Sequence, residues 1–300
     1  MPDRRTFLGN ALALPALAMM PAAAAPALAA RAIPTDGRHL PVVGLGTWQT
    51  FDVGTDAAAY ARLGSVLARF AELGGALVDS SPMYGNSESV LGDLAAQHVL
   101  RERLFLATKI WTRGRSAGIA QMEESLRRLK TPRIELMQVH NLVDWKQQLP
   151  LLRAWKAEGR IRYLGITHYT ASAYGEVEAV LRTEKLDFLQ INYSLLEQDS
   201  AQRLLPLAAE RGVAVIANRP FAEGALFGRV KGRALPAEAA ALGCASWAQL
   251  FLRWILAHPA VTCAIPASSK LAHLEDNMAA GLGPMPGFAE QKALARMAGF

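Results

Sequence analysis

Four ionisable side chains in the first half of the chain are of types that can transfer a proton together. They are Asp79, Tyr84, Lys109 and His140. A free tyrosine has a pKa near 10, but a lysine ammonium about 4 Å away in a partly buried site stabilises the phenolate by about 4 kcal/mol, or roughly three pKa units. Asp79 would hold Lys109 charged, and His140 could donate a hydrogen bond to a substrate oxygen. The set therefore suits reduction of a carbonyl, or the reverse oxidation of an alcohol.

Each of these residues also has a purely structural explanation. A strand-end aspartate often accepts structural hydrogen bonds, a loop tyrosine or a lone histidine often packs, and a buried lysine needs a partner such as Asp79. The catalytic hypothesis depends on all four meeting at one rim. A barrel isomerase or hydrolase that uses Lys109 or Asp79 is a rival, and it would bind no nicotinamide cofactor. Hydride transfer requires such a cofactor, because no side chain supplies a hydride.

The elements that must position these residues repeat along the chain. Short apolar runs predict eight strands buried on both faces, over residues 43–48, 76–80, 104–110, 134–140, 161–167, 188–193, 213–219 and 261–267. Amphipathic stretches between and after them predict eight helices, over residues 57–73, 87–98, 117–130, 148–158, 172–183, 200–210, 246–258 and 270–281. Glycines that end several of these helices just before a strand support the repeat.

Eight strand–helix units predict one α/β domain, a (β/α)8 TIM barrel. Active sites of such barrels lie at the carboxyl ends of the strands, which is where the four ionisable residues fall. An open doubly wound sheet is the rival fold, but the glycine-rich turn that typically follows its first strand is absent. Asp36-Gly37 predicts a β-hairpin over residues 31–42 that would close the bottom of the barrel.

The composition excludes several classes of protein. The chain has 300 residues, of which 51% are hydrophobic and 19% charged, so it is neither disordered nor a coiled coil. Two cysteines are too few for a disulfide framework or a structural zinc site, and we expect no metal. The net charge of +6 is spread along the chain, which favours an anionic small ligand over nucleic acid. We expect a monomer or a weak oligomer.

Residues 1–30 are predicted to be an export signal, which leaves residues 31–300 as the single folded domain. The segment begins with Arg4-Arg5, continues as an uncharged alanine-rich stretch and ends in small residues suited to cleavage. The paired arginines resemble a twin-arginine signal, whose export machinery would be a transient partner and would deliver the protein to the periplasm or beyond. The rival interpretation is a membrane anchor, but prolines interrupt the apolar run.

Several motifs resemble the aldo-keto reductase family over essentially the whole chain after residue 30. They are Gly44-Leu45-Gly46-Thr47-Trp48, the run from Asp79 to Glu88, Ala107-Thr108-Lys109 and Gln138-Val139-His140-Asn141. The resemblance implies a (β/α)8 barrel that reduces an aldehyde or ketone with NADPH, NADH being the less favoured cofactor. It assigns catalysis to Asp79, Tyr84, Lys109 and His140, with Tyr84 as the general acid.

The same resemblance implies which residues bind the cofactor across the barrel rim. The candidates are Gly46, Thr47, Asp79, Thr167, His168, Gln190, Asn218, Arg219, Pro220, Ser268, Lys270, Asp276 and Asn277. Two of them depart from the family pattern: His168 replaces an amide, and Asn218 replaces an aromatic residue that stacks on the nicotinamide, a contact worth about 1 kcal/mol. Arg219 could compensate by reaching the pyrophosphate. Ser268 and Lys270 are the candidates for the 2′-phosphate.

The substrate pocket is predicted to be walled by Trp48 and Trp111 beside Tyr84 and His140, although both tryptophans could simply be packed. The chain ends soon after its last predicted helix, so we expect the pocket to be open on that side. A different kind of function is also open at this stage. The departures at His168 and Asn218, together with the export signal, would suit a nicotinamide-binding sensor or interaction protein with little turnover.

Overall fold

The computed structural model describes residues 27–300, and the expected signal segment lies almost wholly outside them. Eight parallel strands form one curled sheet in the sequential order β3 to β10. Their bounds are Leu45–Gly46 (β3), Leu77–Asp79 (β4), Phe105–Ile110 (β5), Ile134–His140 (β6), Ile161–Thr167 (β7), Phe188–Asn192 (β8), Ala214–Asn218 (β9) and Val261–Ala264 (β10).

The sheet closes on itself because its first and last strands meet. Parallel bridges pair Val43 with Ala264 and Gly46 with Ala267. The amide of Gly44 donates to the carbonyl oxygen of Ala264 at 2.8 Å, which extends this seam beyond the short strand β3. The predicted (β/α)8 barrel is therefore confirmed, and each predicted strand overlaps an observed one.

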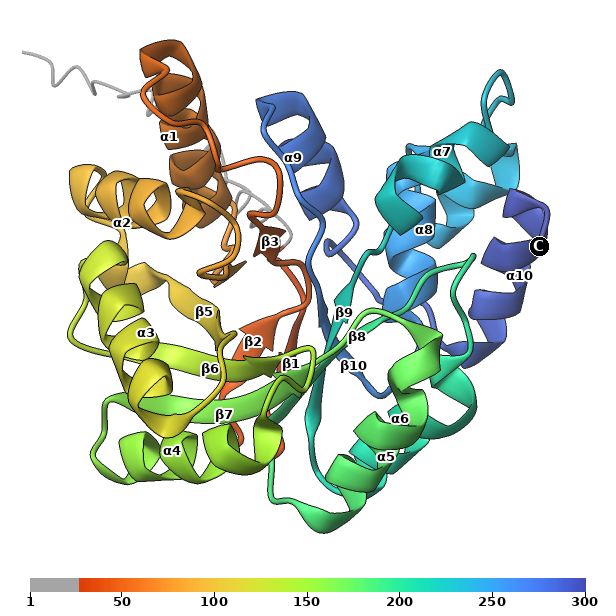
Figure 1. Cartoon of the computed structure of the whole chain (residues 1–300). Helices are drawn as coiled ribbons and strands as arrows, with labels where there is room; N and C mark the ends of the chain where they lie inside the picture. Colours follow the sequence, from red (N-terminus) through yellow and green to blue (C-terminus); the bar gives the residue numbers. More distant parts are fainter. Residues whose placement is uncertain (1–26) are drawn as a thin grey trace, which may run out of the picture.

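Helices surround the strands, as Figure 1 shows. The eight that were predicted are α1 (Ala57–Glu72), α2 (Ser87–Gln97), α3 (Arg115–Arg128), α4 (Trp145–Ala157), α5 (Tyr174–Thr183), α6 (Ser200–Glu210), α8 (Trp247–Leu256) and α9 (Leu271–Ala279). No candidate membrane span is found among the helices of residues 27–300.

Several short or late elements were not predicted. They are α7 (Ala225–Arg229), α10 (Phe288–Ala298) and the 3-10 turns η1 (Arg101–Arg103), η2 (Ala171–Ala173), η3 (Ala222–Gly224) and η4 (Ala237–Leu242). The expectation that the helix over 270–281 is the last one is wrong, because α10 follows it. The buried amide of Gln291 in α10 donates to the hydroxyl of Tyr193 and to the carbonyl oxygen of Trp254, which fixes this helix against the barrel.

The predicted hairpin closes the amino-terminal end of the barrel. Strands β1 (Ala30–Ala32) and β2 (His39–Pro41) pair antiparallel around the turn that contains Gly37. Contacts with the barrel begin slightly earlier in the chain, since Leu28 bridges Leu282 and the amide of Ala29 donates to Gly281. Leu28 and Ala29, which the predicted boundary at residue 31 leaves outside the domain, therefore already contact the barrel.

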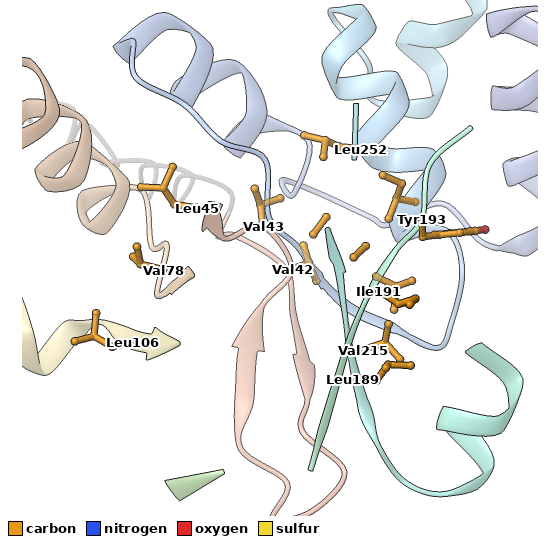
Figure 2. Packing of buried hydrophobic residues seen from close by; sticks show 14 of the residues in the cluster. Val42, Val43, Leu45, Val78, Leu106, Leu189, Ile191, Tyr193, Val215 and Leu252 are labelled. Carbon is orange, nitrogen blue, oxygen red and sulfur yellow. The ribbon is translucent and has the colours of Figure 1, made fainter. Parts of the chain in front are cut away.

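Two apolar cores hold the barrel. The larger lies between the strands and the helices, where outward side chains such as Val78, Leu106, Leu189 and Val215 pack (Figure 2). The smaller fills the barrel interior with alternate residues of the same strands, including Leu77, Ala107, Leu136, Phe188 and Ile216, and the hairpin residues Ile33 and Leu40 pack beneath them. Successive residues of each strand therefore face opposite cores, as the twofold period of a strand requires.

Candidate active site

The alternation that fills the barrel also aims the candidate residues inward at its carboxyl end. In β4 the inward positions are Leu77 and Asp79, and in β5 they are Ala107 and Lys109. The same parity places Gln138 and His140 inside at the end of β6. Thr167, Gln190 and Asn218 follow the same rule at the ends of β7, β8 and β9. Polar side chains thus form the top layer above an apolar barrel interior.

A buried ion pair lies at the centre of this layer. The Nζ atom of Lys109, fully buried, donates to Oδ2 of Asp79 at 2.7 Å and to the carbonyl oxygen of Ser80 at 2.7 Å. The other carboxylate oxygen of Asp79 accepts from Gln190 at 2.8 Å and from Gln138 at 3.3 Å. Burial disfavours the charge on Lys109, but the adjacent Asp79 and Tyr84 outweigh it and raise the lysine pKa above its ordinary value.

Tyr84 reaches this pair from the loop between β4 and α2. A turn in which the amide of Tyr84 donates to the carbonyl oxygen of Ser81 at 3.0 Å folds the loop back over the barrel. The Nζ atom of Lys109 lies 4.9 Å from the centroid of the Tyr84 ring. The expected fall in the pKa of Tyr84 is wrong for the protein alone: burial raises this pKa by more than the charge of Lys109 lowers it. Tyr84 is therefore a protonated phenol at neutral pH.

His140 faces Tyr84 across the rim, with the two ring centroids 6.0 Å apart in an edge-on arrangement. Burial and the nearby charge of Lys109 lower the pKa of His140 to about 2, so the imidazole is neutral at neutral pH. Its Nδ1 atom lies 3.1 Å from the hydroxyl oxygen of Ser81, which accepts from the amide of Met83. If the Ser81 hydroxyl hydrogen goes to Nδ1, the ring proton is on Nε2, where it can be donated to a ligand oxygen.

A cavity of about 560 Å³ opens above these side chains. The predicted site residues that line it are Gly46, Thr47, Trp48, Asp79, Tyr84, His140, Thr167, Gln190, Asn218, Arg219 and Pro220. The remaining wall comes from residues not predicted as site residues: Gln49, Thr50, Met83, Asn141, Tyr169, Phe221, Glu223, Gly224, Ile265 and Ala267. The carboxyl-terminal helix α10 contributes no residue to this wall. Most of the wall residues that were not predicted are in loops, where no periodicity marks an inward position.

One wall of the cavity carries amide and hydroxyl groups. The hydroxyl of Thr167 donates to Oε1 of Gln190 at 3.0 Å. The amide nitrogen of Asn218 donates to the carbonyl oxygen of His168 at 3.1 Å, while its Oδ1 atom is buried and has no hydrogen-bond partner among residues 27–300. The Oδ1 atom of Asn141 is orphaned in the same way. A buried acceptor without a donor is costly, so this wall suits a ligand that brings N–H groups.

The imidazole of His168 accepts hydrogen bonds from its own loop, as an amide oxygen could also do. Its Nδ1 atom accepts from the backbone amides of Tyr169 at 3.0 Å and Thr170 at 3.3 Å, and so fixes the turn after β7. The ring stacks on that of Tyr169, with centroids 5.8 Å apart. Burial lowers the pKa of His168, which keeps the nitrogen available as an acceptor. The imidazole therefore supports the loop while the side chain lies outside the cavity wall.

Arg219 is held within the protein rather than left free. Its guanidinium donates to Glu223 at 2.7 Å, lies 3.5 Å from Glu197, and sits 5.6 Å from the centroid of the Tyr169 ring. The turn that follows is strained, because Arg219, Ala222 and Glu223 all have positive φ angles. An anionic ligand that engages Arg219 must therefore compete with two carboxylates.

The predicted residues near α9 lie beside the cavity rather than in its wall. Lys270 is exposed immediately before the first turn of α9 and forms no ion pair with the described part of the chain. Asn277 donates to the buried hydroxyl of Ser268 at 2.9 Å. The carboxylate of Asp276 accepts from Ser246 and Gln249 at the start of α8, so it fastens α9 to α8. This arrangement explains Asp276 without a ligand.

The two predicted tryptophans are placed differently. Trp48 is 41% exposed and lines the cavity. Trp111 is 43% exposed and outside the wall, yet its ring centroid lies 6.4 Å from that of His140. Both side chains are partly exposed, so neither is ordinary core, but only Trp48 lines the cavity. No cluster of three metal-ligating side chains is found within residues 27–300.

Comparison with known proteins identifies the family to which this chain belongs. The sequence model of the Aldo/keto reductase family matches residues 42–286. Methylglyoxal reductase YeaE of Escherichia coli K12 is 31% identical over 247 residues, which cover 80% of this chain and 85% of the relative. The chain therefore belongs to the aldo/keto reductase family.

Solved structures agree with this assignment. An aldo-keto reductase from Klebsiella pneumoniae in complex with NADPH superposes with a TM-score of 0.76 at 26% identity, covering 91% of this chain and 95% of that one. An aldo/keto reductase from the same organism in complex with NADP and acetate gives a TM-score of 0.74 at 27% identity, over 87% and 93% of the two chains. The (β/α)8 architecture is common to all three.

Proposed function

We propose that the protein is an NADP(H)-dependent oxidoreductase that reduces an aldehyde or ketone to an alcohol, with Tyr84 as the general acid. The observation that carries the proposal is the buried Lys109–Asp79 pair beneath Tyr84, opposite a neutral His140 at the same cavity. Membership of the aldo/keto reductase family and the NADP-bound structural neighbours support the cofactor.

The residues present fit a nicotinamide cofactor. The orphaned Oδ1 atom of Asn218 is an acceptor suited to the amide hydrogens of the carboxamide, and Thr167 and Gln190 lie on the same wall. Lys270 and the free backbone amides of the first turn of α9 suit a phosphate. We therefore propose that Asn218, Thr167 and Gln190 hold the nicotinamide end, and that Lys270 with Ser268 holds the phosphate-bearing end.

When bound, NADPH supplies the hydride that reduces the carbonyl carbon. The chain supplies the proton and the electrostatics. The hydroxyl of Tyr84 gives its proton to the carbonyl oxygen, and the charge of Lys109 stabilises the phenolate that remains. Nε2–H of His140 donates a hydrogen bond that holds the carbonyl oxygen near Tyr84. Asp79 keeps Lys109 charged and in place, and a solvent proton later restores Tyr84.

The cavity favours a small carbonyl compound with an apolar side. Trp48 and Met83, both partly exposed, form an apolar wall next to Tyr84 and His140. Because the relative YeaE is named a methylglyoxal reductase, α-oxoaldehydes are the first substrates to try. We propose small aldehydes as the substrate class.

The proposal is tested by NADPH consumption followed at 340 nm with a panel of aldehydes and ketones, with NADPH binding followed in parallel by fluorescence. Repeated turnover with at least one carbonyl is expected. Tight NADPH binding without turnover across the panel would favour the sensor that His168 and Asn218 suggested. Absence of any nicotinamide binding would support the isomerase or hydrolase alternative.

The proposed site of action of the protein is outside the cytoplasm. This rests on the charged start and alanine-rich stretch of residues 1–30, of which residues 1–26 lie outside the described structure. A twin-arginine route would suit the protein, because such a route carries folded proteins and would allow the cofactor to be bound before export.

A further inference from the structure

A second cavity, of about 420 Å³, lies at the opposite end of the barrel from the active site. The hairpin residues Arg38 and His39 form one side of it, and the first residues of β5, β6 and β7 form the other. The apolar barrel interior, with Ala107 and Leu136, separates this basal cavity from the catalytic residues. Phe105 lines the basal cavity while Lys109 of the same strand belongs to the active site.

The lining of the basal cavity is strongly basic. It contains five arginines and only two glutamates. Its arginines are Arg38, Arg101, Arg103, Arg133 and Arg162, and its glutamates are Glu102 and Glu135. Guanidinium groups gathered in a concavity repel one another, and walls of low dielectric strengthen the field that they produce. The cluster therefore attracts anions unless its charges are neutralised within the protein.

Internal carboxylates neutralise only part of this charge. Arg101 is fully engaged by Glu135, at 3.0 Å, and by neighbouring oxygens. Arg38 has a loose ion pair with Asp36 at 3.6 Å, and Asp36 also accepts from the hydroxyl of Tyr163 at 2.6 Å.

The other three arginines of the basal cavity form no ion pair with the described residues. Among residues 27–300, no carboxylate lies within ion-pair distance of Arg103, Arg133 or Arg162, although the charge of Arg162 is near enough to Asp36 to help lower the pKa of that carboxyl. Arg103 donates one hydrogen bond to the carbonyl oxygen of Ala71, which fixes its guanidinium at the cavity edge. Arg133 directly precedes β6 and Arg162 is the second residue of β7; these neighbouring strands pair Ile134 with Ile161, so both arginines lie at the same end of the sheet.

We propose that the basal cavity binds a small phosphate-bearing molecule, with Arg133 and Arg162 as its main partners and Arg103 at the edge. Guanidinium groups match phosphate oxygens through paired N–H donors, which is the geometry that arginines offer better than lysines. The concave shape, roofed by the hairpin, suits a diphosphate or a phosphorylated metabolite rather than an extended polyanion. Binding would be independent of the reductase site, because the two cavities are at opposite barrel ends.

The test is calorimetric titration of the full-length protein with sodium pyrophosphate at constant ionic strength, with NADP+ saturating so that the reductase site is filled. One pyrophosphate per chain is expected. The Arg133→Gln/Arg162→Gln double variant should bind it at least tenfold more weakly. Arg62→Gln/Arg229→Gln is the matched control, since both residues are exposed, form no ion pair with the described residues, and lie away from this cavity. It has the same net charge and should bind within twofold of the parent.

Folding of each variant is checked by NADP+ affinity and circular dichroism, and Arg103→Gln provides a second, milder variant. Two results would overturn the proposal: pyrophosphate heats no larger than those of added chloride, or equal weakening in both double variants. Sedimentation with phosphatidylglycerol vesicles separates the two sources of phosphate. Vesicle binding that requires Arg133 and Arg162, without pyrophosphate binding, would replace the small ligand with a lipid surface.

Discussion

Among single residues, Ser81 is the hydrogen-bond partner of His140 at the candidate site. Its hydroxyl is buried, accepts from Met83 and lies 3.1 Å from Nδ1 of His140, so it can hold the ring with its proton on Nε2. Residue-type patterns indicated His140 itself but not Ser81, because a serine in a loop has no periodicity that marks it. The inward parity of β6 could have identified Gln138, which precedes His140 by two positions.

Replacing Ser81 by alanine should lower kcat/KM for carbonyl reduction about fivefold, because one orienting hydrogen bond is worth about 1 kcal/mol. NADPH affinity should stay the same, since Ser81 is not among the residues proposed to hold the cofactor. Steady-state kinetics and a fluorescence titration measure both. Ser87→Ala is the matched control: this serine is equally buried but its hydroxyl has no partner among residues 27–300, so activity should be unchanged. Equal losses in the two variants would refute the orienting role.

The neutral state of His140 has a consequence for stability. Its pKa is lowered to about 2 in the folded protein, against an ordinary value of 6.5, so below pH 6.5 the unfolded chain binds a proton that the folded chain excludes. Stability from this residue is therefore lost as the pH falls. Between pH 7 and pH 5 the loss is about 2 kcal/mol of unfolding free energy.

Urea unfolding of the parent and of His140→Gln at pH 7 and pH 5 measures this contribution of His140 to the unfolding free energy. The variant should lose about 2 kcal/mol less than the parent over that interval. A remaining acid sensitivity is expected in both proteins, since burial also lowers the pKa values of His168 and His258. Parallel losses in parent and variant would show that His140 is not held neutral by the fold.

At the scale of elements, the barrel strands were predictable because each is a nearly continuous apolar run between turn residues. The carboxyl-end position of Asp79, Lys109 and His140 followed from that repeat. Helix α10 was missed because its buried face includes the polar Gln291 beside Leu294, which weakens its amphipathic signal. The pKa of Tyr84 was predicted with the wrong sign, because the sequence shows a charged neighbour but not the extent of burial.

Close packing of β7 against β8 positions Thr167 beside Gln190. A Cβ atom on Gly165 would lie 2.5 Å from the carbonyl oxygen of Phe188 and 3.0 Å from its Cβ atom, so Gly165→Ala must push the strands apart. We expect this variant to be destabilised by about 2 kcal/mol and to bind NADPH more weakly. Gly175→Ala in α5 is the control, because nothing lies within 4 Å of its added Cβ atom. Thermal unfolding and NADPH titration compare them, and a Gly165→Ala protein as stable as Gly175→Ala would contradict the packing argument.

For the whole molecule, the contacts of Leu28 and Ala29 bear on the predicted export signal. Cleavage after Ala30 would remove Leu28 and Ala29, which bond to the segment after α9. We expect mass spectrometry of protein recovered from the periplasm to show a mature chain that begins at or before Leu28, since these contacts stabilise the barrel base. Lys substitution of both Arg4 and Arg5 should leave the protein in the cytoplasm. Equal amounts in the periplasm with and without that change would refute the twin-arginine route.

In the proposed reaction, Tyr84 gives a proton to the carbonyl oxygen while the cofactor is held by other residues. Stopped-flow measurement of a single turnover tests it, with NADPH bound beforehand and a carbonyl that the parent reduces. In Tyr84→Phe the rate constant should fall at least 100-fold, since positioned acid catalysis is worth about that much, while NADPH affinity stays within a factor of two. A Tyr84→Phe protein that reduces the carbonyl at the parent's rate would contradict this account.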